Sequence, residues 1–273
     1  MLDVDELKKL LEDIDQVAIL AGERIMEVYA THFEVEQKAD KSPLTMADMA
    51  AHNLIVEKLQ KITPDWPILS EESAKIPFQE RSNWQRYWLV DPLDGTREFV
   101  KRNGEFTVNI ALIENHKPVM GIVYVPVTGV SYFASLNNGA YIRLPEQSPE
   151  PIKVRNCPKD HLIIAGSRSH AGESLQKFIA GLDVKTDLIS IGSSLKICLV
   201  AEGKADIYPR FGLTSEWDTA AAQCIVEQAG GYLTDLELKP LLYNTKESLL
   251  NPHFLVFGDS EKNWSHYIDI STS

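Results

Sequence analysis

The sequence predicts a mixed α/β protein with two successive halves, and three stretches of the pattern indicate this. Apolar residues recur at helical spacing near the amino terminus. From Phe106 to Leu144, short segments rich in β-branched and aromatic residues are separated by turn residues, as in an antiparallel meander. After Cys157, strand-like and helix-like segments alternate, which is typical of an α/β unit. We therefore expect an α+β half over residues 1–157 and an α/β half over residues 158–273.

Two helices should open the first half. Apolar residues from Leu7 to Val28 follow helical spacing, so one long amphipathic helix is expected there. A second helix should start near Thr45, because Thr45 and Asp48 have the spacing of an N-terminal capping box. Asp48 would then be an acidic residue of the first turn, where a negative charge favours the helix dipole.

The remaining elements follow from β-branched runs, turn residues and helical periodicity. In the first half we expect strands at 106–113, 118–126, 130–135 and 140–144, followed by an exposed loop at 145–151. In the second half we expect strands at 162–165, 188–191, 206–208, 232–234 and 253–257, and helices at 175–182, 195–202 and 219–229.

Composition favours a soluble globular enzyme and excludes several other classes. The 273 residues are 44% hydrophobic, enough for one large core or two modest ones. The amino terminus lacks a signal-peptide pattern and no segment approaches the length of a membrane span, so we expect a cytoplasmic protein. The three cysteines show no CxxC spacing, and we expect them to be reduced and buried.

The formal net charge of −12 disfavours a nucleic-acid polymer as a partner, because basic surfaces chiefly hold such polymers. A small anionic substrate is compatible with this charge, since carboxylates can hold divalent cations that present positive charge to a phosphate. We therefore expect bound metal to neutralise part of the negative charge.

The most informative segment is the apolar run that ends in Asp91 and Asp94. Pro92 biases Asp91 toward an extended backbone, so a strand should end here with two carboxylates at its tip. Gly95 lets the backbone approach a ligand, and Thr96 stands where the next helix could begin. Taken alone, this spacing also fits a polar turn after a buried strand.

Two further acidic segments favour a metal site. The apolar run 66–69 leads into Glu71 and Glu72, and Asp218 stands at the head of a strongly helical segment. Three acidic ends of this kind can converge on one point, where their oxygens would suit a hard cation such as Mg²⁺.

These segments match the signatures of a known family. The string Asp91-Pro92-Leu93-Asp94-Gly95-Thr96, followed by Phe99, resembles the first signature of the inositol monophosphatase superfamily of Mg²⁺-dependent phosphatases, and 217–222 resembles the second. Longer strings at 87–107, 191–196 and 201–212 resemble the CysQ-type branch, the bacterial 3'(2'),5'-bisphosphate nucleotidases. The resemblance covers nearly the whole chain. It implies a layered αβαβα sugar-phosphatase fold with the active site between the two halves.

The resemblance also implies which residues hold metal and activate water. Two or three Mg²⁺ ions would be held by carboxylates and one backbone carbonyl, namely Glu71, Asp91, the carbonyl of Leu93, Asp94 and Asp218. Asp91 would bridge two ions, and Glu71, Thr96 and Asp48 would act catalytically on the attacking water. Glu72 would lie outside the metal ligands, because adjacent side chains on an extended segment point to opposite faces.

A nucleotide with two separate phosphates needs a second anion site outside the metal cluster. Serine-rich turns after two predicted strands would offer backbone N–H groups and positive charge, although such turns are also common helix caps. The substrate-binding residues expected from the resemblance are Gly95, Thr96, Ser167, Arg168, Ser169, His170, Ser194, Lys196, Arg210 and Asp218.

The activity implied by the resemblance is hydrolysis of the 3'-phosphate of adenosine 3',5'-bisphosphate to AMP, and also of 3'-phosphoadenosine 5'-phosphosulfate. This places the protein in sulfur assimilation and implies inhibition by Li⁺. An inositol or sugar monophosphatase with the same metal site is the alternative enzyme, and a non-catalytic sensor of Mg²⁺ and nucleotide is the alternative from another class. The sequence leaves open whether the protein is a monomer or a homodimer, and whether it associates peripherally with the inner membrane.

Overall fold

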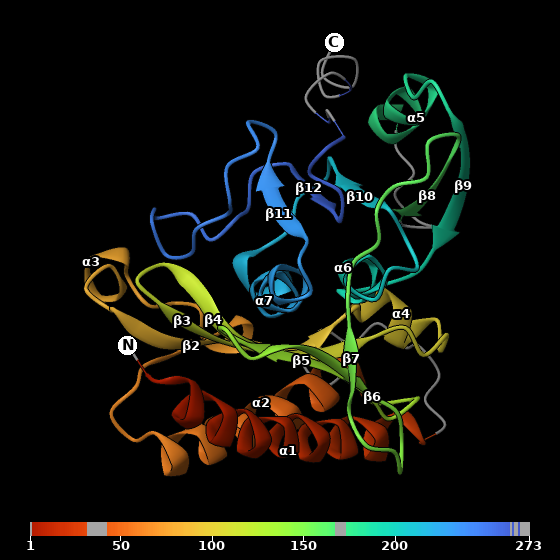
Figure 1. Cartoon of the computed structure of the whole chain (residues 1–273). Helices are drawn as coiled ribbons and strands as arrows, with labels where there is room; N and C mark the ends of the chain where they lie inside the picture. The colour runs from red at the N-terminus through yellow and green to blue at the C-terminus, as the bar shows by residue number, and fades with distance from the viewer. Residues whose placement is uncertain (1, 32–42, 167–172, 263, 265–266, 268–273) are drawn as a thin grey trace.

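Helices, sheet, helices, sheet and helix are stacked in alternating layers in the computed structural model (Figure 1). The structure describes residues 2–31, 43–166, 173–262, 264 and 267. This is the layered αβαβα arrangement that the sequence predicts. No helix within these ranges is both long and apolar enough to cross a bilayer.

The first sheet has seven strands in chain order, and only the β1–β2 pair is parallel. Its strands are β1 Ile68–Ser70, β2 Arg86–Asp94, β3 Thr107–Glu114, β4 Lys117–Val125, β5 Val130–Ser135, β6 Gly139–Arg143 and β7 Glu150–Ile152. The predicted antiparallel meander is therefore confirmed. The prediction of a loop over residues 145–151 is wrong for its last two residues, because they belong to β7, which pairs with β6.

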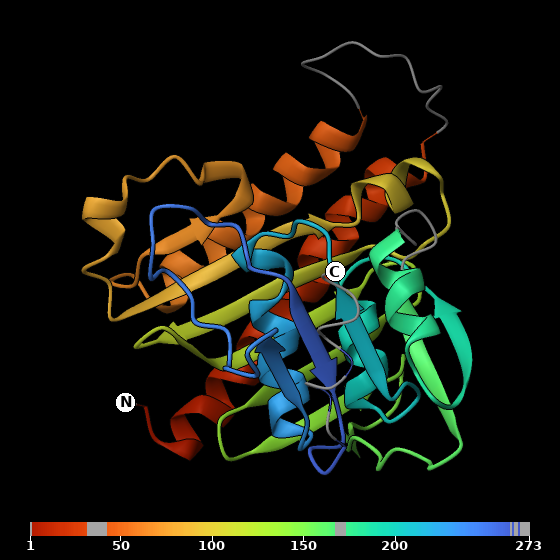
Figure 2. The ribbon, with the colours of Figure 1, turned by 90° about the horizontal axis from the view of Figure 1, so that it is seen from above.

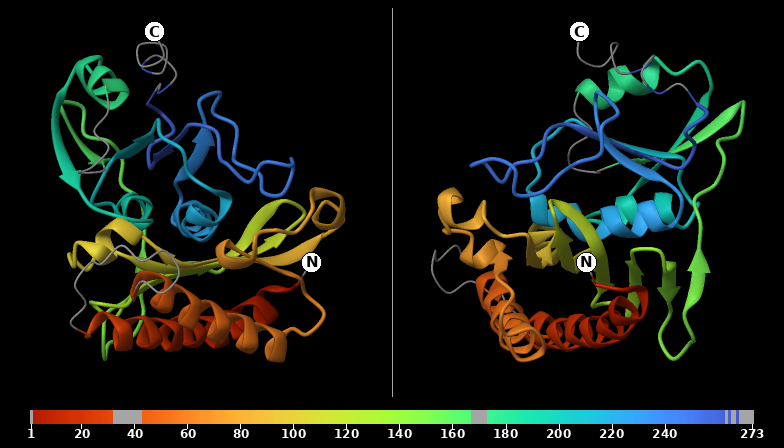
Figure 3. Two further views of the ribbon diagram at one scale, coloured as in Figure 1. Left: turned by 180° about the vertical axis from the view of Figure 1, so that it is seen from behind. Right: turned by 60° about the vertical axis from the view of Figure 1, so that its left-hand side comes forward.

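The long helices α1 (Val4–Tyr29) and α2 (Pro43–Ile62) lie side by side on the outer face of this sheet (Figure 3). Asp3 caps α1 in a reciprocal pair with Glu6, and the apolar face of α1 is buried against the sheet. Helix α2 starts within two residues of Thr45, as expected, but the predicted capping box of Thr45 and Asp48 is wrong. The helix begins at Pro43, since proline suits a first helical turn, and Asp48 therefore lies inside the helix rather than in a capping box.

The second sheet has five strands in the order β11-β12-β10-β8-β9 and lies above the first (Figure 2). Its strands are β8 His161–Gly166, β9 Lys185–Ser190, β10 Ile207–Arg210, β11 Tyr232–Asp235 and β12 Phe254–Phe257. Three helices accompany it: α5 Glu173–Ala180 outside, and α6 Leu195–Ala201 and α7 Ala220–Gln228 between the two sheets. The division expected at residues 157 and 158 falls in the connection between β7 and β8.

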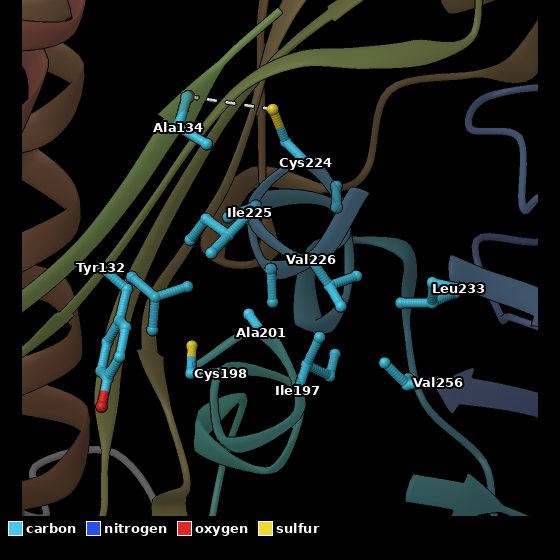
Figure 4. Close-up of a cluster of buried hydrophobic side chains, with 14 of the residues drawn as sticks. Tyr132, Ala134, Ile197, Cys198, Ala201, Cys224, Ile225, Val226, Leu233 and Val256 are labelled. Carbon is cyan, nitrogen blue, oxygen red and sulfur yellow. Dashed lines mark hydrogen bonds between the residues drawn. The ribbon is translucent and has the colours of Figure 1, made fainter. Parts of the chain in front are cut away.

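The contact between α7 and the first sheet is close. Gly121 of β4 permits it, because a Cβ atom at this position would lie 2.1 Å from the Ala221 carbonyl oxygen. Cys198 and Cys224 are buried among apolar side chains of the same layer (Figure 4). All three cysteines are free, but Cys157 is partly exposed, so the expectation of burial is wrong for it.

Side chains of β2 alternate between the two cores that flank the sheet. Trp88 and Val90 belong to the core under α1 and α2, whereas Tyr87 and Leu89 belong to the core around α6 and α7. This alternation directs the next odd-numbered residue, Asp91, toward the layer of α6 and α7.

Candidate active site

A bulge at the end of β2 brings Asp91 and Asp94 to one face of the sheet. Asp91 pairs with Asn109 and Asp94 pairs with Thr107, so three steps along β2 oppose two along β3. Residues three apart on a regular strand point to opposite faces, and the extra residue restores both aspartates to the same face. Pro92 lies inside this bulge, where a missing N–H does not interrupt a regular ladder.

Asp218 reaches the same point from the second half. It ends the 3-10 turn η2 (Glu216–Asp218), and its Oδ2 accepts a hydrogen bond of 2.9 Å from the Ser215 amide. Oxygens of Asp91, Asp94 and Asp218 all lie within 4.8 Å of one another. The structure therefore joins two acidic segments separated by more than a hundred residues.

Ser194 and Asn109 orient the Asp94 carboxylate. The Ser194 amide and hydroxyl both donate to Asp94 Oδ2 at 2.6 Å, and Asn109 Nδ2 donates to the same oxygen at 3.3 Å. The Ser194 hydroxyl also lies 2.9 Å from the Asp218 carbonyl oxygen. Sequence reasoning missed Asn109, although a polar residue within the apolar run of β3 was the available signal.

Crowding of buried carboxylates raises their pKa values. Burial raises the pKa of Asp91 well above its ordinary range, and Asp94, Glu71, Asp218 and Asp48 add to the effect. Burial and the neighbouring Asp94 raise the pKa of Asp218 to about 7. Such a group of carboxylates is costly without a counter-charge, and its oxygen ligands fit a divalent cation of the Mg²⁺ type.

Glu71 joins this group from the 3-10 turn η1 (Glu71–Ser73), and burial and the charges of Asp94 and Glu72 raise its pKa. The expected extended backbone at Glu71 and Glu72 is wrong, because both residues lie on this turn. Glu72 instead shares a side-chain hydrogen bond with Asp48. The pKa of Asp48 is raised to about 8 by burial and by the nearby charges of Glu72 and Glu71. The Oδ1 atom of Asp48 is buried and has no hydrogen-bond partner in the described part of the chain.

Thr96 begins helix α4 (Thr96–Val100), as its sequence position predicts, after Gly95 with a φ of 99°. Its side chain is exposed. Within the described ranges, no hydrogen bond joins it to Asp48. One turn beyond Asp48, the ring of His52 contacts the Ser70 hydroxyl at 2.9 Å, immediately before Glu71. Sequence reasoning missed His52, for which no local pattern gave a signal.

A cavity of about 130 Å³ opens beside the carboxylates, between the two halves. The residues of the expected site that line it are Asp94, Gly95, Ser194, Lys196, Arg210 and Asp218. Ser193 and Tyr208 line it as well. The remaining candidates for the second anion site, Ser167, Arg168, Ser169 and His170, lie outside the described residues.

Lys196 is the buried cation of this cavity. Its ammonium group donates to the carbonyl oxygens of Ser193 at 2.6 Å and Ile191 at 3.3 Å, and it lies 5.5 Å from the ring centroid of Tyr208. Burial lowers the pKa of Lys196 to about 8, against the opposing effect of Asp94.

Two buried donors beside Lys196 have no hydrogen-bond partner among the residues that the structure describes. The Ser193 hydroxyl and Arg210 Nε are both inaccessible to solvent and without a hydrogen bond, and both residues line the cavity. Buried polar groups are rarely left unpaired, so these donors indicate that an anionic or polar ligand completes the site.

A model of the inositol monophosphatase family matches residues 6–265. The chain belongs to the inositol monophosphatase family. Its relatives in this family include the Salmonella typhimurium 3'(2'),5'-bisphosphate nucleotidase CysQ, which is 50% identical over 90% of this chain and 99% of the relative. The Haemophilus influenzae CysQ is 36% identical over 97% of both chains.

Solved structures of the family show the same fold. CysQ from Bacteroides thetaiotaomicron has a TM-score of 0.82 and 43% identity, covering 94% of this chain and 99% of that protein. An inositol monophosphatase from Zymomonas mobilis has a TM-score of 0.79 at 24% identity, covering 97% of this chain and 98% of that protein. The second likeness concerns the fold alone.

Proposed function

We propose that this family member is a Mg²⁺-dependent phosphatase that removes the 3'-phosphate of adenosine 3',5'-bisphosphate, giving AMP and phosphate. The corresponding 5'-phosphosulfate would be a second substrate. The relatives at up to 50% identity are named 3'(2'),5'-bisphosphate nucleotidases, which supports this substrate class. Such an activity would recycle a by-product of sulfate activation, and we expect Li⁺ to inhibit it.

The observation that carries the proposal is the juxtaposition of two different binding environments. The clustered carboxylates of Asp91, Asp94 and Asp218 meet the cavity through Asp94 and Asp218. The Lys196 ammonium and the unpaired donors of Ser193 and Arg210 line the same cavity. One phosphate of a bisphosphate would meet metal held by the carboxylates, and the other would meet the donors.

The carboxylates and one carbonyl would hold two or three Mg²⁺ ions. The proposed ligands are Glu71, Asp91, the Leu93 carbonyl, Asp94 and Asp218. Bound Mg²⁺ supplies Lewis-acid charge that lowers the pKa of water and stabilises negative charge on a departing oxygen. The bulge in β2 and the bonds from Ser194 hold the ligands in fixed directions before substrate arrives.

Proton transfer from water would use the carboxyls around Asp48. Because burial raises the pKa of Asp48 to about 8, and because it shares a hydrogen bond with Glu72, this group can hold a proton near neutral pH. The backbone N–H groups of Gly95 and Thr96 would bind phosphate oxygens, with the positive φ of Gly95 exposing the backbone. We propose that the exposed Thr96 hydroxyl contacts the attacking water and makes no direct hydrogen bond to Asp48.

Ser193 is a proposed contact to the second phosphate, in addition to Lys196 and Arg210. Ser194 is assigned differently from the sequence-based expectation, because its amide and its hydroxyl already donate to Asp94 Oδ2. We propose that it positions metal ligands.

The test compares phosphate release from adenosine 3',5'-bisphosphate and from inositol 1-phosphate by the purified protein with Mg²⁺. We expect a strong preference for the bisphosphate and loss of both activities in Asp94→Asn. Ser193→Ala should raise KM for the bisphosphate about tenfold, as expected for one lost hydrogen bond to a charged group, and leave inositol 1-phosphate unaffected.

A preference for inositol 1-phosphate would overturn the substrate assignment and leave the metal mechanism in place. Tight binding of the bisphosphate without phosphate release would instead identify a sensor.

A further inference from the structure

We propose that Asn251 is a positioning residue for Asp218, an inference that rests on the proposed metal-dependent phosphatase activity. Asn251 follows the long connection after β11 and lies three residues before β12 begins at Phe254. It is only 8% exposed, and it is not among the residues that line the cavity. Its influence on metal or substrate therefore passes through the residues it bonds.

The Asn251 side chain joins both ends of the turn that carries Asp218. Its Nδ2 donates to the Ser215 carbonyl oxygen at 2.7 Å, before the turn, and lies 3.0 Å from the Thr219 hydroxyl, after it. A third contact of 3.2 Å reaches the Thr214 hydroxyl. A single amide group thus spans the η2 turn.

Backbone hydrogen bonds hold the same two segments together. The Glu216 amide donates to the Leu249 carbonyl at 2.8 Å, and the Asn251 amide donates to the Thr214 carbonyl at 2.8 Å. Ser215 and Leu250 form an isolated antiparallel bridge between these bonds. Residues 249–251 therefore lie as a short extended support along the Asp218 turn.

The η2 turn, supported in this way, holds the Asp218 carboxylate in place. Ser215 links the two: its amide donates to Asp218 Oδ2, and its carbonyl oxygen accepts from Asn251 Nδ2. The Thr219 hydroxyl also lies 3.2 Å from the Tyr243 hydroxyl, which donates to it. A 3-10 turn has poorer hydrogen-bond geometry than an α-helix, so external support decides the direction in which its side chains point.

The consequence is a defined effect on metal affinity. Groups that orient metal ligands from outside commonly change metal affinity by about 10- to 100-fold when they are removed. We expect Asn251→Ala to weaken Mn²⁺ binding about tenfold and to raise the Mg²⁺ concentration for half-maximal activity by a similar factor. KM for the bisphosphate at saturating Mg²⁺ should change less than the Mg²⁺ requirement does, because Asn251 reaches the cavity only through Thr214 and Thr219.

The experiment is calorimetric titration of Mn²⁺ into the wild type, Asn251→Ala and Asn251→Ser, together with kinetics at several Mg²⁺ concentrations. The serine variant keeps a short hydroxyl donor and decides the matter if the alanine variant does not fold. Thr234→Val is the matched control, since Thr234 is a buried polar residue of β11 in the same half whose hydroxyl donates to the Asp235 carbonyl oxygen and not to the Asp218 turn. We expect its Mn²⁺ affinity to equal that of the wild type.

Wild-type Mn²⁺ affinity in a folded Asn251 variant would overturn the proposal, as would an equal loss of affinity in Thr234→Val. The calorimetry stands apart from catalysis. If the wild type binds Mn²⁺ but releases no phosphate, the proposed function fails while the Mn²⁺ affinities still decide the role of Asn251.

Discussion

Ser194 binds one oxygen of Asp94 twice, with its backbone amide and its hydroxyl both 2.6 Å from Oδ2. The two residues come from different halves of the chain, because Asp94 ends β2 and Ser194 precedes α6. This pair therefore couples the direction of an expected metal ligand to the packing of the two halves.

Ser194→Ala removes the hydroxyl that donates to Asp94 and lies 2.9 Å from the Asp218 carbonyl oxygen, but it keeps the amide donor. We expect kcat to fall about tenfold with every substrate, because the carboxylate is less well oriented. Steady-state kinetics with the bisphosphate and with inositol 1-phosphate would measure this. A change confined to the bisphosphate would contradict a positioning role and indicate direct substrate contact.

Asp91→Asn should stabilise the metal-free protein, since it removes a buried charge surrounded by like charges. Mg²⁺ should raise the Tm of the wild type and have little effect on the variant, because a cation that binds only the folded state shifts unfolding. Thermal unfolding in EDTA and in excess Mg²⁺ measures both effects. A variant that is less stable than the wild type in EDTA would count against crowding as the cause of the raised pKa of Asp91.

Lys196 should give stability a specific pH dependence. Burial lowers its pKa from an ordinary 10.5 to about 8, so the unfolded chain binds this proton more tightly than the folded protein does. The free energy of unfolding should therefore gain a rising contribution between pH 8 and 10.5 from this residue.

Urea unfolding of the wild type and Lys196→Met across this pH range isolates the contribution. The free energy of unfolding of the wild type should increase relative to that of Lys196→Met as the pH rises from 8 to 10.5. Below pH 8 the difference between the two free energies should be constant. A difference that is flat throughout would mean that the folded protein holds the proton as tightly as the unfolded chain.

Gly121→Ala should disturb the contact between β4 and α7. The added methyl group would lie 2.1 Å from the Ala221 carbonyl oxygen, and backbone cannot rotate away as a side chain can. We expect a loss of about 1–3 kcal/mol in the free energy of unfolding, with reduced activity because α7 follows Asp218. Gly139→Ala is the control, since the nearest atoms there are 3.8 Å away and only its positive φ opposes the change. Gly139→Ala should lose stability through its backbone conformation alone and keep its activity, whereas a Gly121→Ala variant as stable as the wild type would show that the close approach at Gly121 is relieved without cost.

Much of the fold could be predicted from local pattern. Helical spacing from Leu7 to Val28 corresponds to α1, and the β-branched runs after Phe106 correspond to the meander. The errors concern places where pairing partners decide the structure. Strand β7 forms because it pairs with the edge strand β6. The turn at Glu71 is determined by the elements packed around it rather than by its own residues.

The sequence by itself determined the family, the layered fold and the candidate acidic residues, because short signatures and periodic burial are local properties of the chain. Only the tertiary structure decided how these residues meet. An extra residue opposite β3 turns Asp94 to the face of Asp91, and packing of the second half delivers Ser194 and Asp218 to the same point. Strand register and contacts between distant segments are set by the energy of the whole packed core, which no local stretch of sequence contains.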